Sequence, residues 1–460
     1  MGIKAMVIGF VNKILGRTTL ETKLKIKTAV SDEMADAMEL WGLMYCNTPP
    51  WRCGTVKSLN LPSAIASEIA RLVTIEMETH VTGSPRAEWL DGQYLRVIKD
   101  LRRYLEYGCA LGGLVFKPYV CGKDIAVDFV LANQCYPIAF DNAGRISDIV
   151  FVERKQHGST YYTRLERHTM ENTACIITNS AYAGRSAVDL GNEIPLTEVR
   201  EWADLASIAR IENIDRLLIG YFKPTQANTI DPTSPMGVSV YARAVELIRE
   251  ADKQYSRLLW EFEGGELAVD ADAALFRLNP KTGAPELPKG KERLFRALNM
   301  DSTQSGTKPL ETYAPQLRDV SLINGLNQLL QRIEDTCGLA RGTFSDPNQD
   351  ARTATEIKIL KQRSYSTVAD TQKSLQAALS DLVYAMNVWA TLSGLAPPGE
   401  YDMSFEWDDS LIVDMQSEQA IRMQEVAAGL MRPERYIMWR YGCNEEDALA
   451  LLPDSDRMVD

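Results

Sequence analysis

The chain has 460 residues, an apolar content of 45% and a formal net charge of −12 at pH 7. These values fit either about three domains or one elongated subunit with several parts, and they provide enough apolar residues for a core. The negative charge argues against a protein that coats nucleic acid with its whole surface, because phosphate binding needs clustered Lys and Arg. The 8 cysteines form no Cys-x-x-Cys pair and there are only 3 histidines, so the spacing predicts no zinc site.

Residues 1–17 have the spacing of an amphipathic packing helix. They resemble a signal peptide only superficially, because Lys4 and Lys13 divide the apolar run. No stretch of the sequence is long and apolar enough to cross a bilayer, so we predict no membrane partner.

The next part of the chain changes from a helical to a β-rich pattern. Apolar residues recur at helical spacing over 31–107, and Ser31 is placed to cap the first helix. From Leu114 to about Tyr182 the period is two, and turn-forming residues separate the apolar runs. The simplest interpretation is a β-meander.

Two helices of similar length then flank a small insert. The first has an apolar face from Ala244 to Phe262 and follows a Pro-rich connector. Helical spacing disappears between Glu266 and Pro315, after which Asp319 is placed to cap a helix that runs to Gly338. We therefore predict an antiparallel helix pair with the insert at its tip.

The insert is positively charged, which is unusual in this acidic chain. Its cations are Lys281, Lys289, Lys291, Arg293 and Arg296. They form either an ordinary solvated loop or a docking surface for an acidic partner or for passing phosphates.

The longest predicted helix begins at Thr353-Ala354-Thr355-Glu356, which has the form of a capping box. Apolar or small residues then recur every three or four positions and form one stripe: Ile357, Leu360, Ser364, Val368, Thr371, Leu375, Leu379, Leu382, Met386 and Trp389. At about 1.5 Å per residue, such a helix spans roughly 60 Å. The preceding residues 339–352 are polar and rich in turn formers, which is typical of an exposed loop.

The C-terminal part predicts a strand and an acidic helical cap. Residues 403–407 alternate like a strand, and short helices are expected over 416–452. From residue 401 onward there are 14 Asp and Glu against 5 Arg. This excess of carboxylates defines the cap as acidic.

Little in the sequence suggests catalysis. Asp270 with Asp272, and Asp408 with Asp409, could hold a divalent metal, but neither pair has an evident third ligand. Solvated turn carboxylates explain both pairs more simply. We predict no catalytic residue, no metal and no cofactor.

The order of these parts resembles the portal proteins of tailed bacteriophages, the head-to-tail connectors of the long-tailed type. The local matches are Pro235-Met236-Gly237-Val238-Ser239 leading into Asp252-Lys253-Gln254-Tyr255-Ser256, then Ala351-Arg352-Thr353-Ala354-Thr355-Glu356-Ile357, and Phe405-Glu406-Trp407-Asp408-Asp409-Ser410. The resemblance covers essentially the whole chain. It implies an α+β fold: a mainly helical, elongated subunit with a β-rich wing part, a long bridging helix and a small α/β clip.

The resemblance also implies a division of the chain into named parts. They are the wing (1–234, with the long helix and strand of 354–414), the stem helices (235–266 and 316–338), the clip (267–315), the tunnel loop (339–353) and the crown (415–460). The resemblance implies that the tunnel loop faces DNA with Arg341, Thr343, Phe344, Ser345, Asp346, Asn348, Gln349 and Arg352. The five cations of the clip would then dock the packaging motor and adaptor.

A portal protein forms a ring of about twelve subunits around a channel for double-stranded DNA. The implied partners are DNA, the large terminase subunit, the major capsid and scaffolding proteins, and a head-completion adaptor. The implied location is the portal vertex of the virion, with assembly in the host cytoplasm. Sparse cations suit such a conduit, because each neutralised phosphate adds affinity and slows the passage of DNA.

Two other functions are compatible with the residues. One is a metal-dependent DNA-processing enzyme that uses either aspartate pair. The other is a monomeric assembly adaptor with no channel.

Overall fold

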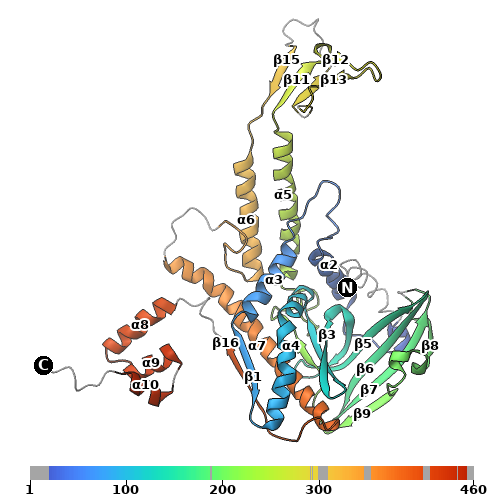
Figure 1. Ribbon diagram of the computed structural model, residues 1–460, viewed down its shortest axis with the longest axis vertical. Coiled ribbons are helices and arrows are strands. Elements are labelled where there is room, and N and C mark those ends of the chain that lie inside the picture. The colour runs from blue at the N-terminus through green and yellow to red at the C-terminus, as the bar shows by residue number, and fades with distance from the viewer. Residues whose placement is uncertain are drawn as a thin grey trace, which may run out of the picture.

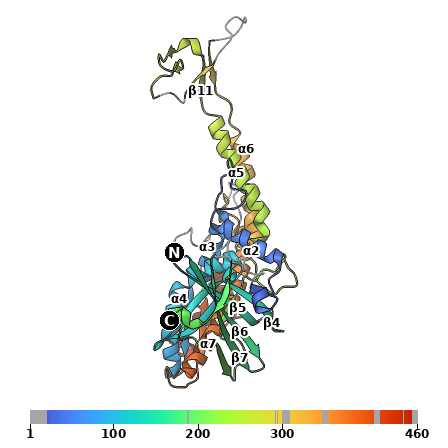
Figure 2. The ribbon, with the colours of Figure 1, turned by 90° about the vertical axis from the view of Figure 1, so that its right-hand side faces the viewer.

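The computed structural model describes residues 20–186, 189–290, 292, 294–298, 309–346, 354–407, 415–442 and 444–452, with only the backbone described at 354–363 and 415–418. The fold is α+β, as predicted, and it is elongated: a pair of long helices rises from a broad body and carries a small β unit at its far end (Figures 1 and 2). Within the described residues, no helix is long and apolar enough to cross a membrane. The predicted N-terminal helix, the capping box at Thr353 and the pair Asp408 and Asp409 lie outside them.

Three helices form one side of the body: α2 (Asp32–Tyr45), α3 (Leu61–Thr74) and α4 (Pro85–Leu111). The side chain of Ser31 caps α2, as the sequence predicts, by accepting a hydrogen bond from the Met34 amide. Ser84 caps α4 in the same way, and Pro85 occupies the first turn, where its missing N–H costs nothing.

A strand that the helical interpretation of 31–107 missed lies between α3 and α4. β1 (Met77–Thr82) pairs antiparallel with β16 (Asp402–Trp407), so that Met77 lies opposite Trp407. The two strands are more than 300 residues apart in the sequence. β1 is only 6 residues long and lies between two helices, so the helical spacing on either side concealed it.

The predicted β-meander is wrong as a single sheet. β2 (Leu114–Cys121) and β3 (Asp124–Leu131) form a hairpin that pairs with β10 (Gly220–Phe222). A short 3-10 helix, η1 (Ala132–Gln134), then turns the chain into a second sheet. The strands of that sheet are β4 (Cys135–Phe140), β5 (Ile146–His157), β6 (Thr160–Glu171), β7 (Ala174–Gly184), β8 (Asn192–Ile194) and β9 (Ile208–Glu212).

In the second sheet, β4 to β8 follow the order of the chain, and β9 pairs with the part of β7 that β8 leaves free. The 3-10 helices η2 (Leu196–Glu198) and η3 (Arg200–Trp202) cross between β8 and β9. The buried indole of Trp202 packs η3 against this end of the sheet.

The helix pair consists of α5 (Val245–Gly264) and α6 (Asp319–Cys337), which follow the short 3-10 helix η4 (Ala242–Ala244) and the insert respectively. They are antiparallel, with the insert at their far end, as the sequence predicts (Figure 1). Glu261 of α5 bonds Arg318 at 2.7 Å at that end. Asp319 was expected to cap α6, but Arg318 holds the cap position and makes no side-chain capping bond.

The base of α5 is tied to the body by a buried carboxylate. Asp252, which is 1% exposed, accepts hydrogen bonds from the Trp51 indole at 2.9 Å and from the Leu59 amide at 2.8 Å. Both donors precede α3, so the helix pair is anchored to the helical side of the body.

The described part of the insert contains β-strands and one 3-10 turn but no α-helix, so the α/β description of the clip is wrong. β11 (Ala268–Asp272) pairs parallel with β14 (Phe295–Leu298) and antiparallel with β15 (Leu310–Tyr313). η5 (Ala273–Leu275) follows, and β12 (Arg277–Leu278) pairs with β13 (Pro285–Glu286).

The long helix α7 (Ala354–Leu392) crosses the body and joins its two sides. The predicted stripe is buried from Val368 to Met386, with Leu375, Leu379 and Leu382 fully covered. β10 reaches α7 closely at Gly220, where an added Cβ would lie 2.2 Å from the Ala378 carbonyl oxygen. The helices α8 (Met415–Ala427), α9 (Pro433–Tyr441) and α10 (Glu445–Leu451) pack on one another in chain order.

Candidate functional site

The predicted tunnel loop begins where α6 ends. Gly338 adopts a left-handed conformation, φ +74°, which terminates the helix. The Leu339 amide then donates to the Glu334 carbonyl at 2.8 Å, which is the hydrogen bond of a Schellman cap. We call residues 339–346, which follow this cap, the loop root.

The side chain of Glu334 organises the loop root. Its carboxylate belongs to a residue that is 0% exposed. Oε1 accepts hydrogen bonds from the amides of Phe344 at 2.5 Å and Ser345 at 2.8 Å. Oε2 accepts from the Ser345 hydroxyl at 2.7 Å and from the Gly342 amide at 3.2 Å. Both oxygens are therefore satisfied by donors of the loop root.

Further contacts fasten the loop root to both neighbouring helices. The Ala340 amide donates to Ser364 Oγ of α7 at 2.8 Å, and the Asp346 amide donates to Asn327 Oδ1 of α6 at 2.8 Å. Arg341 lies at the surface and forms an ion pair with Asp335 at 2.6 Å. This hydrogen-bonded carboxylate raises the pKa of Arg341.

The expectation of an exposed loop holds only in part for the loop root: Arg341, Gly342 and Asp346 are exposed, but other residues are covered. Ser345 is 5% exposed and Leu339 is 2% exposed, while Phe344 packs partly buried against the main core. The Thr343 hydroxyl donates to the Ala340 carbonyl at 2.6 Å, which keeps the turn compact. Of the predicted DNA-facing residues, Asn348, Gln349 and Arg352 lie outside the described part.

The structure describes three of the five predicted docking cations of the insert, and their surroundings differ. Lys281 and Lys289 are exposed and make no ion pair with the described residues. Arg296 instead bonds Asp270 through two nitrogens, at 2.7 and 3.1 Å, and lies 4.8 Å from the centre of the Tyr313 ring. Lys291 and Arg293 lie outside the described residues.

The first aspartate pair is engaged by the protein. Asp270 holds Arg296, and Asp272 accepts a hydrogen bond from the Ala274 amide at 3.0 Å to start a turn. Across the described residues, no group of three or more His, Cys, Asp or Glu side chains is placed to hold a metal ion. These contacts favour the interpretation of Asp270 and Asp272 as turn and ion-pair residues.

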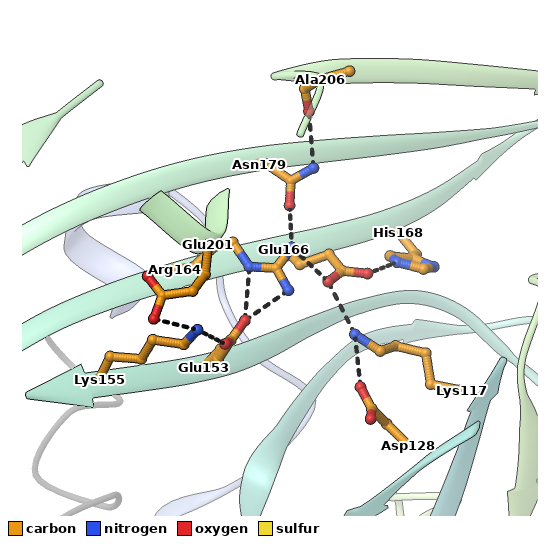
Figure 3. A network of polar contacts seen from close by, with 10 residues as sticks. All are labelled: Lys117, Asp128, Glu153, Lys155, Arg164, Glu166, His168, Asn179, Glu201 and Ala206. Atoms are coloured by element: carbon orange, nitrogen blue, oxygen red, sulfur yellow. Dashed lines mark hydrogen bonds and ion pairs between the residues drawn. The ribbon is translucent and has the colours of Figure 1, made fainter. Parts of the chain in front are cut away.

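The densest polar cluster in the described structure was not predicted from the sequence. It lies between the hairpin of β2 and β3 and the face of β5, β6 and β7 (Figure 3). We call it the wing network, and its charged members are Lys117, Asp128, Glu153, Lys155, Arg164, Glu166, His168 and Glu201.

Glu166 is the centre of the wing network. Its carboxylate lies 2.9 Å from Lys117, 3.0 Å from Arg164 and 2.6 Å from Nε2 of His168. Burial alone would raise the pKa of Glu166, but the His168 hydrogen bond and the cations Lys117 and Arg164 outweigh burial and lower it strongly. Glu166 therefore stays ionised, and His168 Nε2 must be the donor.

This arrangement joins two sheets, and within the described residues Nδ1 of His168 is the ring nitrogen left without a hydrogen-bond partner. Lys117 belongs to β2, whereas Arg164 and Glu166 belong to β6. A sequence signal did exist: Arg164, Glu166 and His168 alternate along a strand, so they share one face, and a charged face between apolar runs indicates a polar contact. The sequence did not show which charges of β2 and β3 lie opposite them.

The chain matches the family model described as "Phage portal protein, SPP1 Gp6-like" over residues 86–449. The match extends from α4 to α10 and covers well over half of the chain. The chain therefore belongs to the SPP1 Gp6-like phage portal proteins, a structural and non-enzymatic family. No curated protein is similar enough to the chain to count as a match.

Proposed function

We propose that this chain is the subunit of a portal ring at the unique vertex of a phage capsid, and that the ring forms the channel through which double-stranded DNA is packaged and ejected. The observation that carries this proposal is the family match over 86–449, which includes the helix pair, its insert, the loop root and the long helix.

Within this proposal, α5 and α6 are the stem and the insert is the clip, with the body as the wing and 415–460 as the crown. The clip would dock the large terminase subunit during packaging and a head-completion adaptor afterwards. Exposed Lys281 and Lys289 support this role, because they can pair with an acidic partner. The capsid and scaffolding proteins would surround the wing and crown.

The tunnel loop, 339–353, would face the DNA. Its cations are few, and Arg341 is already paired with Asp335. A surface with few free cations holds phosphates weakly, so DNA can slide past it. The small number of unpaired cations supports a conduit rather than a tight DNA-binding protein.

The first test is the mass of the purified protein by light scattering, followed by electron microscopy of the particles. We expect rings of about twelve or thirteen subunits with a central hole. A monomer near 51.4 kDa at all salt concentrations, even with scaffolding protein present, would contradict the proposal.

The second test concerns docking by the clip. Lys281→Glu combined with Lys289→Glu should leave ring formation intact and weaken terminase binding, since both cations are exposed. Lys373→Glu is a suitable control, because this exposed lysine lies on α7, outside the insert. Equal terminase binding by both variants would exclude the clip as the docking surface.

A further inference from the structure

We propose that Glu334 is a positioning residue for DNA passage: it holds the loop root against α6 and so fixes the point at which the chain leaves Asp346 toward residues 347–353. This inference rests on the proposed function, because it assigns the loop root a role in the channel. It adds a specific residue that is neither exposed nor a cation.

The position of the Glu334 carboxylate is unfavourable for a negative charge. Glu334 lies in the last turn of α6, where the carbonyl end of the helix carries partial negative charge and repels an anion. It is 0% exposed, so water does not solvate it. Within the described residues it forms no direct ion pair, since Arg341 bonds Asp335 and attracts Glu334 only from a longer distance. A buried anion persists in such a site only if hydrogen-bond donors surround it.

The donors all come from the loop root. The amides of Gly342, Phe344 and Ser345 and the Ser345 hydroxyl point at the two oxygens of Glu334. Three backbone amides converge on one carboxylate only when the chain folds back over the end of α6. The ionised side chain and this loop conformation therefore require each other.

The surroundings leave the loop root no room to shift as a unit. The backbone at Gly338 passes so close to α7 that an added Cβ would lie 2.3 Å from Thr367 Oγ1. On the other side, the Asp346 amide is held by Asn327 at 2.8 Å. The last described residue before 347 is thus fixed relative to α6, with Glu334 at the centre of the fixed segment.

The decisive variant is Glu334→Gln in the full-length chain. Glutamine has the same shape, but its amide group presents N–H donors to a site that already consists of donors, so at least two of the four hydrogen bonds are lost. Glu246→Gln is the control: it makes the same chemical change at a carboxylate of α5 that is 74% accessible and lies outside the loop root.

Two measurements are made on rings of each variant. Hydrogen exchange reports on the amides of Gly342, Phe344 and Ser345, and procapsids that contain the variant as their only portal report on DNA packaging. For Glu334→Gln we expect normal rings, at least about tenfold faster exchange at these amides and at least about tenfold fewer DNA-filled heads. Glu246→Gln should match the wild type in both.

The outcomes separate this inference from the proposed function. Unchanged exchange in Glu334→Gln rings, or faster exchange with normal packaging, overturns the positioning role. If Glu334→Gln forms no rings, Ser345→Ala decides, because it removes only the hydroxyl donor: normal packaging overturns the role and reduced packaging supports it. Failure of the wild-type chain to form rings or to fill heads would instead overturn the proposed function.

Discussion

Glu166 and Glu334 are both carboxylates with little or no contact with water, yet the molecule compensates their charges differently. In the wing network, Glu166 is surrounded by Lys117, Arg164 and His168. At the loop root, Glu334 is surrounded by neutral amides and one hydroxyl. In the wing network the negative charge is neutralised by positive charges, whereas at the loop root it is stabilised by the dipoles of several hydrogen-bond donors.

The difference follows from the elements that supply the partners. Strands of two sheets bring long charged side chains together from separate parts of the chain, which fixes one sheet relative to the other. A loop that folds over a helix end brings backbone amides instead, which fixes the path of the chain. Removal of Glu166 takes away the buried carboxylate that Lys117 and Arg164 share and leaves them the more exposed Asp128 and Glu153. At Glu334, only neutral donors lose their acceptor. We therefore expect larger effects on stability in the wing network.

The largest expected effect is that of Glu166→Ala. It leaves Lys117 with Asp128 at 3.8 Å and Arg164 with Glu153 at 2.9 Å, so the two cations are only partly compensated, and we expect a cost of about 3 kcal/mol of unfolding free energy. Urea unfolding followed by circular dichroism measures this loss. Glu212→Ala removes an exposed carboxylate from Arg210 and should change the unfolding midpoint little. Equal losses in the two variants would show that the wing network is not a buried charge cluster.

Acid should weaken the wing network. The pKa of Glu166 lies well below its ordinary value of 4.5, so the unfolded chain binds a proton at this group more readily than the folded chain does. Its contribution is complete above pH 4.5 and falls as the pH drops below that value. The loss is at most about 1.4 kcal/mol per pH unit for one proton, or about 2 kcal/mol by pH 3. Unfolding measured from pH 6 to 3 should show a shallower fall in Glu166→Gln than in the wild type.

Ser345→Ala tests the loop root with a smaller change. The hydroxyl donates to Glu334 at 2.7 Å and is buried, so its loss should cost about 1–2 kcal/mol of unfolding free energy. Thr343→Val is a comparison within the same turn, since it removes a hydroxyl that donates to a neutral carbonyl rather than to a carboxylate. A larger loss for Thr343→Val than for Ser345→Ala would contradict the central place of Glu334.

The smallest expected effect is that of Arg341→Ala. Its ion pair with Asp335 is partly exposed, with the two side chains 42% and 25% accessible, so water and salt screen it. We expect less than about 0.5 kcal/mol in thermal unfolding. A loss as large as that of Ser345→Ala would mean that Arg341 also stabilises Glu334 through space.

Much of the secondary structure could be predicted because it depends on neighbours in the sequence. Ser31 begins α2, Gly338 ends α6, and the stripe through Leu375 and Leu382 is the buried face of α7. These features depend on local capping, on left-handed glycine and on the 3.6-residue period. The antiparallel helix pair followed from two such helices on either side of a short insert.

The candidate site could be predicted only in outline. The sequence placed a turn-rich segment after α6, but polar composition alone made Ser345 and Phe344 look exposed. Their burial depends on Glu334, whose spacing from them carries no recognisable motif. β1 was missed because it is a 6-residue strand between two helices, and its pairing with β16 became visible only in the fold.

The sequence by itself determined where helices and turns begin and end, which side of α7 is apolar, and the order of parts that resembles a phage portal protein. Only the tertiary structure decided that the β-rich region divides into two sheets and that Lys117 and Glu166 form an ion pair between them. It also decided that the Glu334 carboxylate accepts hydrogen bonds from the loop root. The physical reason is that these interactions act over different separations along the sequence. Periodicity and caps act within a few residues, whereas the compensation of a buried charge depends on whichever distant groups the fold brings within about 3 Å.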